Sequence, residues 1–160
     1  MQNLTQTPVL NMLELDAKAR YQYFIQKIVA KREVWGLYHE GWAMSGTVGG
    51  KMALPLWPDA KYARLCNTRN WAKYEVQRMS LKTLVEELIP LLIEKQCMAS
   101  VFLTPDWSSV LVEPERLLAD IKSYVYACFQ QEKNNLPEQN QTKTSQAEQG
   151  LPPITTTAIQ

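Results

Sequence analysis

The segment VWGLYHEGWAMSG, residues 34–46, constrains the fold more than any other part of the chain. It holds two strand-like runs, 34–38 and 42–46, on either side of Glu40-Gly41, where glycine accepts the positive φ of a two-residue turn. Because side chains alternate along a strand, such a hairpin would place four large apolar side chains on one face: Trp35, Leu37, Trp42 and Met44. We expect helices to cover that face, since burial of a large apolar side chain contributes about 1.5–3 kcal/mol.

Three amphipathic stretches predict helices that cover the sheet, and Pro58 begins a shorter helix expected to run to about Cys66. Asp16 can cap a helix that runs to about Arg32. Its apolar stripe comprises Ala17, Tyr21, Phe24, Ile25, Ile28 and Val29. Ser80 can cap a second helix, which Pro90 must kink or divide. Pro114 begins the last helix, whose inward side chains are expected to be Leu117, Leu118, Ile121, Tyr124, Val125, Cys128 and Phe129.

Further short runs complete the pattern of strands. A third strand, 52–57, contains Pro55, which favours a sheet edge or a strand end because proline cannot donate to a ladder. A weaker run follows at 74–79, and the runs 97–104 and 110–113 predict a second hairpin. Strands joined by short turns and interrupted by helices are typical of α+β proteins. We therefore predict an α+β fold, a single compact domain with a mostly antiparallel sheet of five or six strands packed by about four helices.

Composition sets the expected boundaries of that domain within the 160 residues. From Glu132 onward Gln, Asn, Thr and Pro dominate, and such a segment buries too little apolar area to offset its ordering entropy. We expect a loose N-terminus at 1–12, one α+β domain at 13–131 and a disordered polar tail at 132–160.

Bulk properties argue against several classes of function. The net charge of +1 does not favour nucleic acid or an anionic membrane, and no apolar run approaches the roughly 20 residues of a membrane helix. The three cysteines, Cys66, Cys97 and Cys128, are too far apart in sequence for a metal or redox motif. They predict reduced thiols in a cytoplasmic protein. His39 is the single histidine and lies at a turn, so we expect neither catalytic residues nor a metal or other cofactor.

Two features indicate a binding surface. The segment from Lys61 to Lys82 contains six basic residues and one acid, Glu75. Aromatic residues lie between the basic ones in the sequence. Trp107 lies in the loop sequence PDWSS, and an exposed tryptophan at a loop tip is a plausible interface anchor, although it could also fold back over the sheet. The candidate binding residues are Trp107, Trp71, Arg69, Lys73 and Trp57.

Several ordered blocks of the chain resemble a known family. They are RYQYFI at 20–25, VWGLY at 34–38, GWAMS at 41–45, PLWPDAKYARLC at 55–66, the tryptophan at 71, VFLTP at 101–105 and EPERLLADI at 113–121. Together they resemble the bacterial domain of unknown function 2750 family over about residues 13–125. This resemblance implies a small cytosolic bacterial protein without an established activity, so no catalytic residues carry over. More remotely, the layout is similar to that of SseB N-terminal domains, which bears on fold rather than function.

Three functions remain open from the sequence. The first is a non-enzymatic interaction module that binds an unknown protein partner through one face or the Trp107 loop. The second is an enzyme or small-molecule binder with a pocket near Trp57, Trp71 and Arg69. The third is a weak nucleic-acid binder that uses residues 61–82. The sequence does not fix the oligomeric state.

Overall fold

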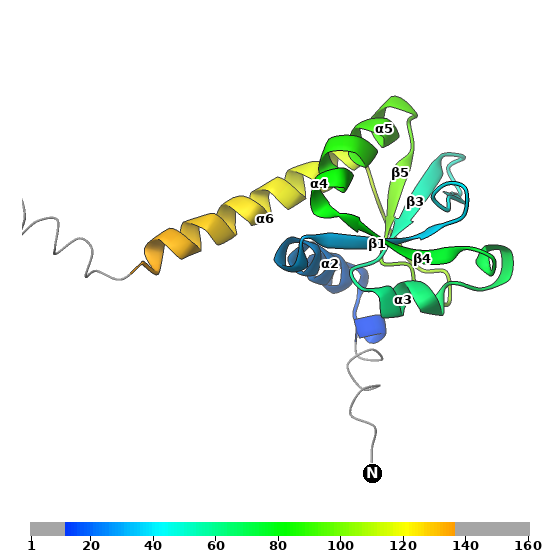
Figure 1. Ribbon diagram of the computed structural model, residues 1–160, viewed down its shortest axis with the longest axis horizontal. Helices are drawn as coiled ribbons and strands as arrows, with labels where there is room; N and C mark the ends of the chain where they lie inside the picture. Colours follow the sequence, from blue (N-terminus) through cyan, green and yellow to red (C-terminus); the bar gives the residue numbers. More distant parts are fainter. Residues whose placement is uncertain (1–11, 137–160) are drawn as a thin grey trace, which may run out of the picture. The chain divides into compact units, whose positions relative to one another are not determined.

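Six strands and the helices around them form the part of the chain that the computed structural model describes, residues 12–136 (Figure 1). Residues 1–11 and 137–160 lie outside it, and with them most of the predicted loose N-terminus and polar tail. The chain divides into two units, one ending at Val125 and one beginning at Tyr126. The structure confirms the α+β class, and the predicted single compact domain is the unit that ends at Val125, which holds all six described strands.

The strands form two sheets. Two antiparallel strands make the smaller sheet, β1 (Glu33–Tyr38) and β4 (Glu75–Ser80). The larger sheet has the order β2-β3-β5-β6, with bounds Ser45–Gly46, Met52–Leu56, Met98–Val101 and Val110–Val112. Its β3–β5 pair is parallel, and the other pairs are antiparallel. A bridge joins the sheets, because the N–H groups of Trp35 and Trp57 each donate to the other's carbonyl at 2.9 and 2.8 Å.

The predicted hairpin at 34–46 is wrong. Trp35 lies opposite Arg78 of β4, and only an isolated bridge joins Tyr38 to Trp42. The indole of Trp42 covers Gly36, where a Cβ atom would lie 3.0 Å from the ring, so Trp42 lies on the face opposite Trp35. The six-residue ladder with β4 satisfies more backbone groups than a short hairpin would, although β4 lies some 40 residues away. Both tryptophans are half-buried against the core.

The second predicted hairpin is confirmed, since β5 pairs antiparallel with β6. Pro55 lies inside β3 rather than at its end. Alternate N–H groups of a strand point to the same side, so the nitrogen of Pro55 faces the same side as that of Trp57. On that side β3 pairs with β2 at Met52 and Ala53 and bridges to β1 only at Trp57. Pro55 therefore lies in the gap between the two partners, where no donor is needed.

The caps of the first two helices are confirmed. α2 (Ala17–Lys31) begins after Asp16, whose carboxylate accepts from the N–H of Ala19 at 2.7 Å. Ser80 caps the second helical segment by accepting from Thr83 N–H at 3.0 Å. That segment is divided, as Pro90 predicts, into α4 (Leu81–Thr83), a π-helical turn η2 (Leu84–Leu88) and α5 (Ile89–Glu94). A shorter helix, α3 (Ala60–Leu65), and a 3₁₀ turn, η1 (Arg69–Trp71), precede β4.

The last helix, α6 (Pro114–Asn134), begins at the predicted proline. Leu117 and Ile121 are buried as expected, but Val125 and Phe129, predicted to face inward, are exposed. An apolar stripe identifies a helix face, and whether that face is covered depends on the rest of the fold. The helix also runs past residue 132, so the predicted start of the polar tail falls within it. In the described range, no helix combines the length and apolar character needed to cross a bilayer.

The core lies where the helices meet the sheets. α3 packs on β1 and β4, α2 on β1 and β6, and α5 on β5; Figure 1 shows α2 and α3 beside the β1–β4 pair. The largest fully buried side chains are Trp57, Tyr62, Phe24 and Phe102. Helices thus cover the sheets as the sequence predicts, with a different pairing of strands beneath them.

Candidate binding surface at the 104–108 loop

The loop of residues 104–108, between β5 and β6, is closed by hydrogen bonds of its own. The N–H of Thr104 donates to the carbonyl of Ser108 at 2.8 Å, and the N–H of Trp107 donates to the carbonyl of Thr104 at 2.9 Å. The hydroxyl of Thr104, which is buried, accepts from the N–H of Ser108 at 3.3 Å and donates to the carboxylate of Asp106. The loop tip is therefore fixed by local bonds.

Three predicted binding residues come together at this loop. Trp107 is 43% exposed and lies 5.2 Å from Trp71, centroid to centroid, while Trp71 is 7% exposed. The guanidinium carbon of Arg69 lies 5.9 Å from the centre of the Trp107 ring, within cation–π range. Both Arg69 and Trp107 have left-handed backbones, with φ of 56° and 65°. The buried Trp71 ring thus packs against the exposed Trp107 indole, which also contacts the Arg69 guanidinium.

Trp57 supports the loop from inside. It is fully buried, so it does not offer a contact surface as the sequence had suggested. Its indole N–H donates to the carbonyl of Leu103 at 2.9 Å, and the thiol of Cys66 lies 3.4 Å from the same oxygen. Burial raises the pKa of Cys66 to about 11; the contact with Trp57 lowers it, and the charge of Asp106 raises it. Cys66 is therefore a protonated thiol at neutral pH and a poor nucleophile.

Arg20 is a residue that the sequence reasoning missed. It is 6% exposed, and its guanidinium donates to the Leu15 carbonyl at 3.1 Å and the Ser108 hydroxyl at 3.4 Å. Its Nε is buried without a hydrogen-bond partner. A signal was present, because Arg20 lies four residues before Phe24 and eight before Ile28, on the buried stripe of α2.

Asp106 is exposed beside Trp107. The hydrogen bond from Thr104 lowers its pKa below the usual range, and the positive charge of Arg20 adds to this effect. The carboxylate is therefore ionised at neutral pH. Within the chain it already has a hydrogen-bond donor, Thr104, and a cation that stabilises its charge, Arg20.

The segment 67–74 carries the other candidates. The amide of Asn67 donates to the carbonyl of Tyr74 at 2.7 Å, which closes the segment around η1. Lys73 is exposed there, two residues after Trp71. The Tyr74 ring packs edge-on against His39 at 5.6 Å, so the single histidine is an exposed aromatic contact.

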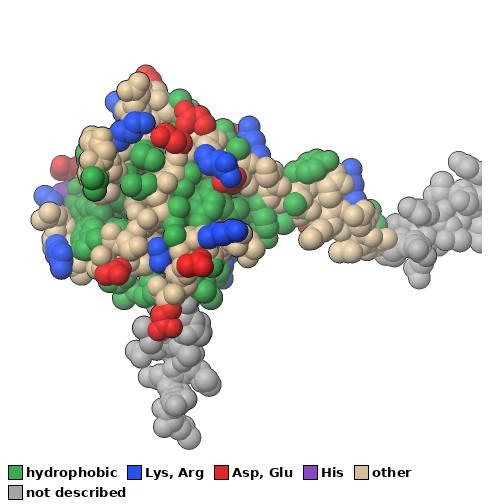
Figure 2. All heavy atoms as spheres, turned by 180° about the vertical axis from the view of Figure 1, so that it is seen from behind, with side chains coloured by type: hydrophobic (Ala, Val, Ile, Leu, Met, Phe, Trp, Pro, Cys, Tyr) green, Lys and Arg blue, Asp and Glu red, His purple; other side chains and the backbone are tan. Residues whose placement is uncertain are grey.

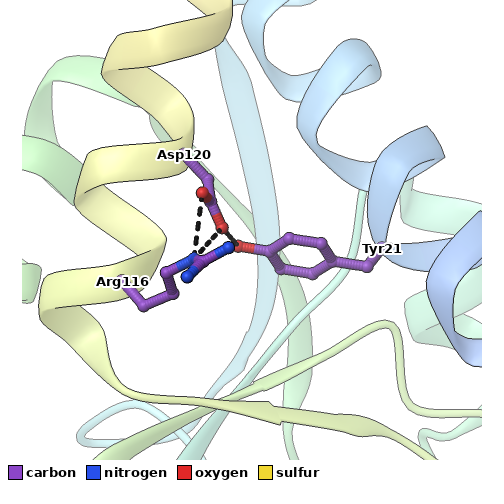
Figure 3. A network of polar contacts seen from close by, with 3 residues as sticks. All are labelled: Tyr21, Arg116 and Asp120. Carbon is purple, nitrogen blue, oxygen red and sulfur yellow. Dashed lines mark hydrogen bonds and ion pairs between the residues drawn. The ribbon is translucent and has the colours of Figure 1, made fainter.

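A second polar cluster joins α2 to α6 (Figure 3). Tyr21 donates to the carboxylate of Asp120 at 2.6 Å, and Nε of Arg116 donates to both oxygens of that carboxylate at 3.1 Å. Burial, and then the hydrogen bond to Asp120, raise the pKa of Tyr21 well above its usual value. Each group in this cluster has a partner, so we assign it to holding the two helices together.

Two features of the described residues bear on metal-ligand and thiol chemistry. Within residues 12–136, no three His, Cys, Asp or Glu side chains are grouped so that they could hold a metal ion. The cysteines there are free, and the most buried of them, Cys66, is held protonated. Three of the predicted binding residues meet at one place: the exposed Trp107 indole contacts both Trp71 and Arg69.

Comparison with known proteins identifies the family. A model described as Protein of unknown function (DUF2750) matches residues 21–121. The chain belongs to this family. The resemblance predicted from the sequence blocks is therefore confirmed, and the match includes Arg69, Trp71 and the 104–108 loop. No curated protein and no solved structure gives a significant match. The similarity in layout to SseB N-terminal domains stays a prediction.

Proposed function

We propose that this DUF2750 chain is a non-enzymatic protein-interaction module whose contact surface is centred on Trp107. The observation that carries the proposal is an indole that is 43% exposed yet held by a closed loop and by Trp71 beneath it. Tryptophan and arginine are the side chains most enriched where alanine substitution costs binding energy.

The rigidity of this surface favours binding. Ordering a flexible side chain on association costs about 0.5–1.5 kcal/mol. Trp107 has its backbone fixed by the bond to Thr104 and its ring packed on Trp71, so much of that cost is met in the free protein. The exposed part of the ring gains no burial free energy on folding, and a partner that covers it supplies that gain on binding.

The alternative functions have less support. Trp57 is fully buried, which removes one of the three residues of the suggested small-molecule pocket from the surface. In the basic segment, Arg78 pairs with Glu33 at 3.3 Å and Lys61 lies over the ring of Tyr62. On the face shown in Figure 2, basic and acidic side chains alternate with hydrophobic ones rather than forming a basic track. The proposal includes a cytoplasmic location, which suits three free cysteines.

Site-specific photo-cross-linking tests the proposal. A photoreactive amino acid at Asn70, an exposed position between Arg69 and Trp71, should capture a defined partner in the host cell. The same probe at Leu111, 46% exposed on β6, is the control and should not. The captured protein, once purified, should bind the Trp107→Ala variant at least about tenfold more weakly than the natural chain. Equal affinity for the variant, or equal capture from Leu111, contradicts the proposal.

A further inference from the structure

We propose that the surface around Trp107 recognises an acidic segment of a partner protein, in which an Asp or Glu carboxylate binds Arg69 while a neighbouring apolar side chain packs on the Trp107 indole. This inference rests on the proposed interaction function and specifies the chemistry of the partner.

Arg69 carries an unneutralised charge. Among residues 12–136, the ion pairs within 4.0 Å use Lys31, Lys51, Arg78 and Arg116 as the cations. Arg69 is exposed, and its contact is with the Trp107 ring. A ring face attracts the cation but accepts little from the N–H donors at the guanidinium edge. Those donors remain free for an incoming ligand.

The geometry suits a carboxylate. Guanidinium presents parallel N–H donors that match the two oxygens of a carboxylate, and such charge-assisted pairs are roughly twice as strong as neutral hydrogen bonds. η1 and its hydrogen bonds, from Trp71 N–H to Thr68 and from Ala72 N–H to Arg69, fix the backbone of Arg69. The cation and the indole are thus presented together, which favours a ligand that carries a carboxylate next to an apolar group.

The acid next to Trp107 in sequence does not supply that carboxylate. Asp106 adjoins Trp107 in sequence, but its carboxylate is held by the Thr104 hydroxyl and lies in the field of Arg20. Lys73, two residues after Trp71, adds a further exposed cation, and Glu75 is the only acid between Lys61 and Lys82. Charge complementarity therefore favours an acidic partner.

Peptide selection tests this directly. Random 12-residue peptides displayed on phage would be selected on the full chain, and the enriched peptides resynthesised with a fluorescent label. We expect them to carry Asp or Glu within two residues of an aromatic or large aliphatic side chain. Arg69→Glu should weaken their binding at least about tenfold, and Arg69→Lys, which keeps the charge but loses the paired donors, by less.

Matched variants separate local recognition from general attraction. Lys82→Glu makes the same change of charge at another exposed cation of the basic segment and should change the affinity by no more than about twofold. Circular dichroism and thermal unfolding establish that each variant is folded. Enriched peptides without acidic residues, equal losses for Arg69→Glu and Lys82→Glu, or displacement of the peptide by a 12-nucleotide oligo-dT at lower concentration than by unlabelled peptide would each overturn the proposal.

The failures of the two proposals are distinguishable. If Trp107→Ala abolishes binding and Arg69→Glu does not, the interaction surface stands and the acidic partner is wrong. If neither variant weakens binding, both proposals are wrong.

Discussion

The two sides of the 104–108 loop are built in opposite ways. On the inner side, Trp57 and Cys66 both contact the buried carbonyl of Leu103. On the outer side, Trp107 packs on Trp71 and contacts Arg69, and the rest of its ring and the Arg69 side chain face solvent. On the inner side, the buried Leu103 carbonyl has hydrogen-bond donors. On the outer side, the Arg69 guanidinium has no acidic partner among the described residues and the Trp107 ring is partly exposed.

This difference indicates which side the fold depends on. The buried indole N–H of Trp57 holds the carbonyl of Leu103, the residue directly before the loop. The contacts on the inner side hold the loop in its conformation. The outer side carries the exposed side chains, Trp107 and Arg69. Substitutions inside should therefore reduce stability, and substitutions outside should reduce binding with little effect on stability.

The largest effect is expected from Trp57→Ala on the inner side. Removal of a fully buried indole leaves a cavity and leaves the Leu103 carbonyl with only the weak thiol donor of Cys66, and should lower the free energy of unfolding by about 3–5 kcal/mol. Urea denaturation followed by circular dichroism measures this. Trp57→Phe keeps most of the volume and should cost less, chiefly through the lost hydrogen bond. A Trp57→Ala variant of nearly natural stability would show that the inner side does not hold the fold.

A pH-dependent effect of intermediate size should come from Cys66. Its pKa is raised from an ordinary value near 9 to about 11, so the folded chain retains the thiol proton that the unfolded chain loses. Its stabilising contribution is complete below pH 9 and falls as the pH rises to 11, by up to about 3 kcal/mol.

The measurement for Cys66 is a comparison of two pH profiles. Unfolding free energies of the natural chain and of Cys66→Ala, taken between pH 8 and about 11, should differ in slope, with the steeper decline in the natural chain. Parallel profiles would mean that the thiol titrates as in the unfolded chain.

The smallest effect on stability should come from Trp107→Ala. The indole is partly exposed and loses only its contacts with Trp71 and Arg69, so we expect a decrease of about 1 kcal/mol or less. Thermal unfolding of this variant beside Trp57→Ala compares the two sides directly. Similar losses for both tryptophans would remove the distinction between an inner and an outer side.

Local signals in the sequence predicted much of the fold. Asp16 and Ser80 cap helices through bonds to residues three positions away, so their effect is readable from spacing alone. Pro90 divides its helix for an equally local reason. The β5–β6 hairpin also joins neighbours in sequence.

The failures all depend on distant residues. β1 pairs with β4 rather than with residues 42–46. The local sequence at Glu40-Gly41 carries no information about a strand as distant as β4. Trp71 and Trp107 were candidates for separate reasons, but only the fold shows that their rings touch. Arg20 was passed over because arginine is seldom buried, and its partners Leu15 and Ser108 lie on different segments.

Pro55 has a consequence for how the sheets keep their alignment. If β2 slid two residues along β3, one of its carbonyls would meet a nitrogen that has no hydrogen to offer, and that rung of the ladder would be missing. Pro55 thus penalises a two-residue slip of β2 toward Trp57, the residue that bridges to Trp35. The missing N–H removes no hydrogen bond from the native pairing, but it disfavours one wrong register of the larger sheet.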